Sequence, residues 1–249
     1  MIRDGRTTKA ATDLTRKEMK GPDHFQVAAT DAAEWLSKNR RVAGAALAAA
    51  AVFVVAGLVV HGYVTSGRNA AGGELYRALD AADGVVSTVP LPGVDRPTFV
   101  SEAERQKAVI AAADLTRQQH PGTRAAVTAA LASGEAHLRL EEWDAAMGDL
   151  NAYLAAAPPD DALRFAGLDG LARAQEGKGD LAAAAATFER AGREAPFYRD
   201  RAELERARVL ARAGKDDEAK KLLAAFPGEF KDSPLKGEAA ERLAALGGK

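Results

Sequence analysis

The chain contains no cysteine among its 249 residues. This absence excludes a disulfide framework, a thiol nucleophile, a lipid-modified cysteine and any zinc site built on cysteine ligands. The sequence also lacks an excess of either charge, since 34 Lys and Arg residues stand against 35 Asp and Glu residues. A balanced charge gives no electrostatic reason to expect a nucleic-acid partner or a general attraction to anionic lipid.

Motifs that carry catalysis are missing as well. The sequence has no phosphate-binding glycine loop, no nucleophile elbow and no histidine pair with metal-ligand spacing. Acidic pairs such as Asp160 with Asp161 fall at predicted turns or helix starts, where carboxylates complement the positive end of the helix dipole. A general acid and base among them is the less favoured alternative. We therefore expect a protein that is not an enzyme, with no cofactor, metal ion or small-molecule substrate.

Charged residues make up 28% of the chain but are absent from Val42 to Val64. A helix of this length spans about 34 Å, which matches a bilayer hydrocarbon core of about 30 Å. The run is longer than the apolar region of a signal peptide, which has about 7 to 15 residues and lies near the chain start. It therefore predicts an uncleaved transmembrane helix over 42–64, with a cleaved signal and a buried soluble helix as the alternatives.

Basic residues predict the orientation of this helix. Lys38, Arg40 and Arg41 precede the run, and positive residues tend to stay on the cytoplasmic side of a membrane. The abundance of alanine and arginine is typical of a bacterium with a GC-rich genome. We therefore expect a single-pass inner-membrane protein with these parts: a disordered cytoplasmic tail over 1–22, a juxtamembrane amphipathic helix over 23–41 and a periplasmic domain over 65–249.

The expected periplasmic part contains a helical repeat. The segment Gly134–Pro158 places small residues at Gly134 and Ala146, an aromatic residue at Trp143 and a proline at its end. These offsets resemble those of the tetratricopeptide repeat, in which small residues let two helices cross closely and a proline ends the second helix. Trp143 is accordingly expected in the core of this repeat.

Further copies of the pattern lie on both sides of the first. A weaker one pairs a helix that starts near Glu74 with a helix before Pro121, and a clearer one covers Leu168–Pro196. A last copy ends at Pro227, which is expected to cut its second helix short.

The turns of these copies recur at a nearly constant spacing. Glu141, Gly179 and Gly214 are 38 and 35 residues apart, and a tetratricopeptide unit has about 34 residues. We therefore expect an all-α fold in which the transmembrane helix is followed by an α-solenoid of about four such hairpins and a closing helix over 233–246. No sheet is expected, and the proline-rich segment Ser87–Val100 is expected to be irregular. An unrelated alanine-rich helical bundle is the alternative.

The order of these elements resembles the ancillary subunit family of the bacterial Sec translocon. The similarity involves WLSKNRR before the apolar run, GGELYRALDAA after it and SGEAHLRLEEWDAAMGDL as the clearest repeat. It implies a membrane-anchored scaffold that binds partner or client proteins near the translocon or another inner-membrane complex. The alternative is a permanent structural subunit of a large envelope-spanning assembly.

The resemblance to tetratricopeptide arrays also implies a partner-binding face, because the first helix of each hairpin lines the concave side there. Carried onto this sequence, the groove-facing positions are Thr128, Leu131, Glu135, Leu138 and Arg139, then Asp169, Arg173 and Glu176, then Arg201, Leu204, Arg208 and Arg212. The last group is rich in arginine, whose guanidinium suits carboxylates, so an acidic segment or a free C-terminus is the expected ligand. The alternative is that these arginines only form solvated pairs with nearby glutamates.

Overall fold

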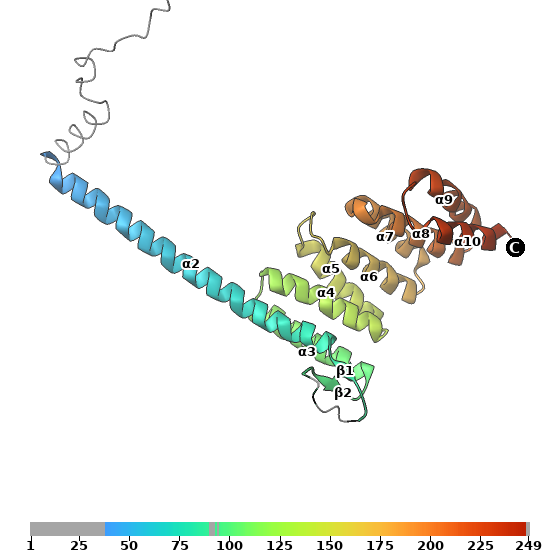
Figure 1. Cartoon of the computed structure of the whole chain (residues 1–249), viewed down its shortest axis with the longest axis horizontal. Coiled ribbons are helices and arrows are strands. Elements are labelled where there is room, and N and C mark those ends of the chain that lie inside the picture. The colour runs from blue at the N-terminus through green and yellow to red at the C-terminus, as the bar shows by residue number, and fades with distance from the viewer. Residues whose placement is uncertain (1–37, 90–92, 94, 248–249) are drawn as a thin grey trace, which may run out of the picture. The chain divides into compact units, whose positions relative to one another are not determined.

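The computed structural model describes residues 38–89, 93 and 95–247, with the side chains of 40–52 and 63 outside that description. The expected tail over 1–22 and most of the juxtamembrane helix over 23–41 therefore lie outside the described residues. The chain divides into two units, residues 1–63 and 64–249. Both units contribute to helix α2, Arg40–Ala82 (Figure 1).

The backbone of the uncharged run is helical, as expected, and lies within α2. Among the described residues, no helix is long and apolar enough to cross a membrane. Much of the run over 42–64 falls on residues whose side chains lie outside the description. In the part of the run whose side chains are described, Phe53, Leu58 and Val59 are exposed by 79%, 66% and 66%.

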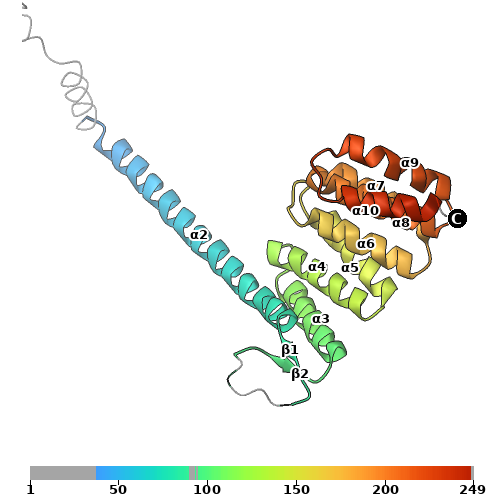
Figure 2. The same ribbon diagram turned by 45° about the vertical axis from the view of Figure 1, so that its right-hand side comes forward.

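The second unit consists of helices that pack against their neighbours in chain order. They form successive hairpins, which Figure 2 shows stacked side by side. The helices are α3 Glu102–Gln119, α4 Arg124–Arg139, α5 Trp143–Ala156, α6 Arg164–Gly177, α7 Leu181–Glu194, α8 Arg199–Arg212, α9 Asp216–Glu229 and α10 Lys236–Gly247, with a short 3₁₀ turn at Pro196–Tyr198. Ala78, near the end of α2, belongs to a buried cluster with Ala113 of α3 and Ala129 of α4. The expected solenoid of hairpins with a closing helix is therefore confirmed over this unit.

The turns inside the hairpins share one backbone geometry. Gly179 and Gly214 have φ angles of +84° and +76°, and Glu141 has a φ of 58° at the corresponding place. A left-handed residue after the last helical turn lets the chain reverse, and glycine adopts it without a Cβ clash. The next helix then starts at once, and in one case the Asp180 side chain accepts a hydrogen bond from the Ala183 N–H. The repeat register drawn through these three positions is confirmed.

Small residues allow close helix crossing where the repeat pattern predicts it. A Cβ added at Gly134 of α4 would lie 2.7 Å from the Leu150 side chain of α5. Leu150 and Ala146 are completely buried, so this contact lies in the core of the hairpin. The core continues along the solenoid through Tyr153, Phe188 and other side chains that contact helices on either side. Each hairpin thus covers the apolar face of the next.

The expectation that Pro227 cuts its helix short was wrong. Helix α9 runs through Pro227 to Glu229 and is as long as α8. Proline removes one helical hydrogen bond, but Pro227 lies in the last turn, and the Phe230 N–H closes that turn on the Phe226 carbonyl at 2.9 Å.

The proline-rich loop carries a small parallel pairing where no sheet was expected. Strand β1, Val85–Val86, pairs with β2, Thr98–Phe99. The loop is anchored because the Phe99 ring packs directly on Gly84, where a Cβ would clash with it. That contact brings the two ends of the loop together, and the Val85 N–H donates to the Pro97 carbonyl at 2.8 Å.

Candidate functional site

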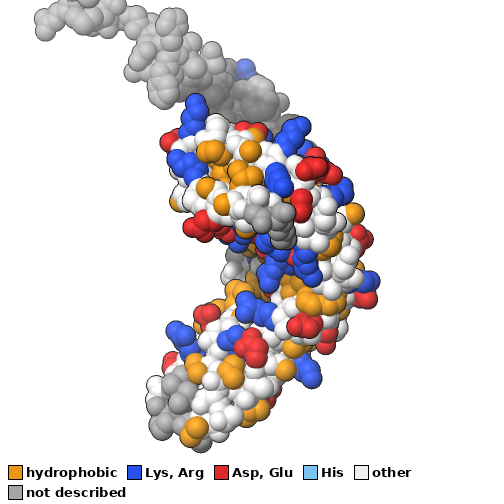
Figure 3. Space-filling model, turned by 90° about the vertical axis from the view of Figure 1, so that its right-hand side faces the viewer, with side chains coloured by type: hydrophobic (Ala, Val, Ile, Leu, Met, Phe, Trp, Pro, Cys, Tyr) orange, Lys and Arg blue, Asp and Glu red, His pale blue; other side chains and the backbone are white. Residues whose placement is uncertain are grey.

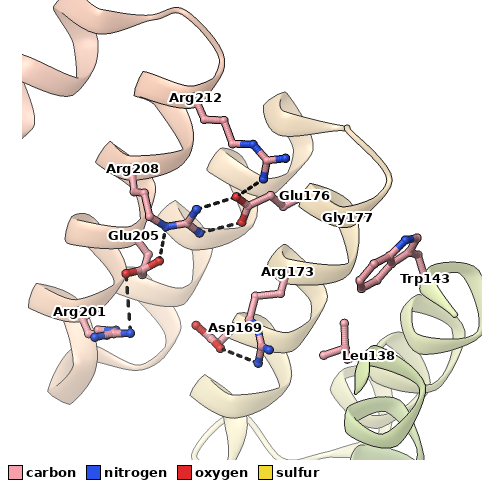
Figure 4. A pocket seen from close by; sticks show the side chains of 10 residues that line it. All are labelled: Leu138, Trp143, Asp169, Arg173, Glu176, Gly177, Arg201, Glu205, Arg208 and Arg212. Atoms are coloured by element: carbon pink, nitrogen blue, oxygen red, sulfur yellow. Dashed lines mark hydrogen bonds and ion pairs between the residues drawn. The ribbon is translucent and has the colours of Figure 1, made fainter. Parts of the chain in front are cut away.

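A cavity of about 410 Å³ lies along the inner side of the hairpins, and we call it the concave groove. Figure 3 shows Lys and Arg side chains gathered where this face of the molecule is hollowed. Helices α6 and α8 supply most of the lining, and α4 and α5 supply one residue each. The lining residues, shown in Figure 4, are Leu138, Trp143, Asp169, Arg173, Glu176, Gly177, Arg201, Glu205, Arg208 and Arg212.

Glu176 of α6 lies at the centre of the charged network. Its carboxylate accepts hydrogen bonds from Arg208 Nη1 at 2.6 Å, from Arg208 Nη2 at 2.7 Å and from Arg212 Nη1 at 2.6 Å. The side chain of Glu176 is only 9% exposed. The hydrogen bonds from Arg208 hold the pKa of Glu176 below its ordinary value, although burial opposes the shift. This pairing joins α8 of one hairpin to α6 of the preceding one.

Glu205 of α8 is the second carboxylate of this charged network. It accepts a hydrogen bond from Arg208 Nε at 2.7 Å, and Arg242 Nη2 and Arg201 Nη2 lie 3.3 Å and 3.7 Å from it. Burial by itself raises the pKa of the Glu205 carboxyl, but the surrounding arginines outweigh burial and the pKa is lowered. Arg208 is therefore held by two carboxylates, which raise the pKa of its guanidinium.

The α4 side of the groove is less tightly paired. Arg173 Nη1 lies 3.9 Å from Asp169 Oδ2 and 3.9 Å from Glu135 Oε2, which is beyond hydrogen-bond length. Burial raises the pKa of both carboxyls, because nearby Arg173 only partly compensates for the lost hydration.

Exposure separates structural arginines from available ones. The side chain of Arg208 is 34% exposed, whereas Arg173, Arg201 and Arg212 are 52%, 48% and 58% exposed. Each guanidinium has five N–H donors in a planar fork that matches a carboxylate. The groove can therefore offer these three arginines to an anionic group while Arg208 stays engaged with Glu176 and Glu205.

The structure brings most of the expected partner-binding residues together. Those that line the groove are Leu138, Asp169, Arg173, Glu176, Arg201, Arg208 and Arg212. Two others, Glu135 and Arg139, line a neighbouring cavity of about 210 Å³ between α2, α3 and α4. Thr128 is half-buried on α4 and lines neither cavity.

Leu131 and Leu204 were wrongly placed on the groove. Leu131 is 7% exposed and Leu204 is fully buried, and both belong to the core between the hairpins. In α8 the groove stripe runs through Arg201, Glu205 and Arg208. Leu204 is one residue away from Glu205, and one residue turns a helix by about 100°. The spacing of four and then three residues along this stripe was the signal that could have identified Glu205.

Trp143 was expected in the core but is half-buried and lines the groove. Its ring packs on Gly177 of α6, where a Cβ would lie 2.7 Å from the ring. The indole therefore forms an apolar wall beside the charged residues. Truncation of Trp143 consequently removes less buried surface than a core position would.

The contacts of the groove arginines are of two kinds. Arg201 lies 3.7 Å from Glu205 four residues farther along α8, a pair within one helix of the kind that the solvated-pair alternative expects. Arg208 combines a pair within its helix with hydrogen bonds to Glu176 of another hairpin. The groove arginines are thus organised by tertiary contacts and not only by helical neighbours.

Stacked hairpins that cross at small residues and line a charged groove define an α-solenoid of tetratricopeptide type. Residues 33–221 match the family model described as a tetratricopeptide repeat-like domain, and the chain belongs to this family. Comparisons with curated proteins and with solved structures give no match. Domains of this type typically mediate interactions between proteins, so the family indicates a protein-interaction scaffold.

Proposed function

We propose that this protein is a membrane-anchored scaffold of the bacterial envelope that binds partner or client proteins through its concave groove. The ligand would be an acidic segment or a free C-terminus, near the translocon or another inner-membrane complex. The proposal rests on a difference in exposure and pairing among the arginines of the groove. Glu176 and Glu205 hold Arg208 in place, while Arg173, Arg201 and Arg212 keep about half of their surface open to a ligand.

The polar character of the groove favours recruitment over a fixed structural role. A subunit packed permanently against neighbours would leave a large apolar surface uncovered when alone. The groove is instead lined mainly by charged side chains. An exposed pair of aromatic residues supports the structural alternative. Phe197 and Tyr198 are 86% and 41% exposed, and the Tyr198 ring stacks on the Phe165 ring with their centroids 4.6 Å apart.

The membrane anchor rests on α2. Its apolar residues Phe53 and Leu58 are exposed by 79% and 66%, and a bilayer would cover them. The matched family segment begins at residue 33 and so includes the whole uncharged run over 42–64. Lys38, Arg40 and Arg41 before that run support a cytoplasmic N-terminus and a periplasmic C-terminal domain.

Protease added to spheroplasts is expected to digest the C-terminal domain and to spare an N-terminal tag, because only the domain would face outward. The tag should be digested after the membrane is permeabilised, which serves as the control. Extraction with sodium carbonate should leave the chain in the membrane fraction. A protected C-terminal domain, or a chain released by carbonate, would contradict the proposed topology.

Reversal of two groove charges, Arg173→Glu with Arg201→Glu, is expected to weaken binding of a short Asp/Glu-rich peptide by at least about tenfold, since each charge-assisted hydrogen bond contributes roughly 1.5–3 kcal/mol. The free energy of unfolding should also fall, because the new carboxylates would lie near Glu135, Asp169 and Glu205 and repel them, so binding is compared under conditions in which the variant is still folded. Fluorescence anisotropy with the purified full-length chain measures the binding, and chemical denaturation measures the stability.

A matched control reverses two arginines outside the groove, Arg124→Glu with Arg193→Glu, which are 84% and 64% exposed. This control has the same change in net charge and should bind the peptide as the parent does, apart from a weak long-range effect. Arg208 is left unchanged because its loss would disturb Glu176 and Glu205. Equal binding by the groove variant and the control would remove the groove from consideration.

A further inference from the structure

A second cavity, of about 210 Å³, lies at the closing end of the solenoid, and we call it the terminal slot. Helices α8, α9 and α10 surround it. Its apolar lining consists of Ala207, Ala211, Leu223, Ala245 and Leu246. Two arginines, Arg208 and Arg242, complete the wall.

The slot exists because the residues that face it are short. The lining includes Ala207 and Ala211 of α8 and Ala245 of α10, while the buried Leu223 and Leu246 contribute longer aliphatic side chains. Alanine side chains leave open the space that larger residues would fill. The open apolar space therefore suits an aliphatic side chain from a ligand, since its burial removes apolar surface from water.

The terminal slot and the concave groove share a wall. Arg208 lines both, and Glu205 connects Arg208 to Arg242 through contacts of 2.7 Å and 3.3 Å. Arg208 stays engaged with Glu176 and Glu205 through three of its N–H groups. Arg212, one helical turn farther along α8, adds a 58% exposed guanidinium.

An aliphatic pocket beside a cluster of guanidinium groups has a particular chemical complement. The last residue of a polypeptide carries a carboxylate and a side chain on the same Cα, so it can present both groups at short range. An acidic residue inside a chain carries a carboxylate but no aliphatic group on the same Cα. The juxtaposition therefore favours a chain terminus that ends in an aliphatic residue.

We infer that the terminal slot binds the aliphatic side chain of a partner's C-terminal residue, with the α-carboxylate bound by the exposed guanidinium of Arg212 in the adjoining groove. This inference rests on the proposed function of the groove and deepens it. It assigns the specificity for the last residue to Ala211 and Ala245, which are accessible on the slot wall, and the affinity for the acidic part of the partner to the groove arginines.

Three short Asp/Glu-rich peptides test the inference on the purified full-length chain. One ends in a Leu free acid, one in a Leu amide and one in a Ser free acid. The Leu acid is expected to bind about tenfold more tightly than either of the others, which corresponds to the loss of one charge-assisted hydrogen bond or of one buried aliphatic side chain.

Two variants fill the slot from opposite sides, Ala211→Met from α8 and Ala245→Leu from α10. Each should reduce binding of the Leu acid to the level of the Ser acid while leaving the Ser acid unaffected. Ala244→Leu is the matched control, because Ala244 is exposed on α10 and does not line the slot. Thermal denaturation of each variant shows whether the fold is retained, and two filling positions guard against one that is not.

The outcomes of the peptide experiment separate the slot inference from the proposed function of the groove. Equal binding of all three acidic peptides, unchanged by the filling variants, would overturn the slot inference and leave the groove proposal intact. Equal binding of Leu acid and Leu amide would assign the slot to an internal apolar residue and overturn the C-terminal assignment. Absence of binding by every peptide would overturn both.

Discussion

Replacement of Phe188 by alanine is expected to lower the free energy of unfolding by about 3–5 kcal/mol, the usual cost of deleting a buried aromatic ring. Phe188 of α7 is 1% exposed and belongs to a core cluster that includes Ala172 of α6, Leu204 of α8 and Leu223 of α9. Loss of the ring would leave a cavity where consecutive hairpins meet. Because each hairpin is stabilised by its neighbours, the whole solenoid should unfold at a lower denaturant concentration.

The same substitution at Phe197 provides the control. Phe197 is 86% exposed, and surface substitutions usually change stability by no more than about 0.5 kcal/mol. Urea denaturation followed by circular dichroism measures both variants against the parent. A similar loss at the two positions would show that the hairpins are not packed through Phe188.

Replacement of Arg208 by alanine is expected to cost about 3 kcal/mol at neutral pH, because two carboxylates lose their main partner. Glu176 and Glu205 have side chains that are only 9% and 10% exposed, so their charges are poorly hydrated. Arg212 and Arg242 remain beside them and should keep the loss from being larger. Arg193→Ala, which breaks an exposed pair with Glu189, should cost only a few tenths of a kcal/mol by comparison.

The loss at Arg208 should depend on pH. The pKa values of Glu176 and Glu205 are lowered in the folded protein, so the stability that they contribute is present above the ordinary value of 4.5 and is lost as pH falls through the folded values. In the Arg208→Ala variant, the two carboxyls already contribute less stability at neutral pH than they do in the parent. The difference in unfolding free energy between parent and variant should therefore narrow below pH 4.5, and a difference that stays constant in acid would contradict the assigned network.

The sequence determined the repeat and the positions of its turns, because these depend on neighbours within one or two helical turns. Small residues at Gly134 and Ala146 predicted the crossing of α4 and α5, and the structure places both at the contact with Leu150 or beside it. The left-handed residues at Gly179 and Gly214 follow from the same local pattern. The all-α class and the tetratricopeptide-like family were therefore predictable without any tertiary contact.

Only the tertiary structure decided which residues face the groove and what they contact. Leu204 and Glu205 are adjacent in the sequence, yet one is in the core and the other holds Arg208, since one residue rotates a helix by about 100°. Glu176 and Arg208 meet across 32 positions of the chain, and no local spacing predicts such a pair. The half-buried position of Trp143 and the terminal slot likewise depend on how one hairpin lies against the next, because side chains from separate helices fill or leave open the space between them.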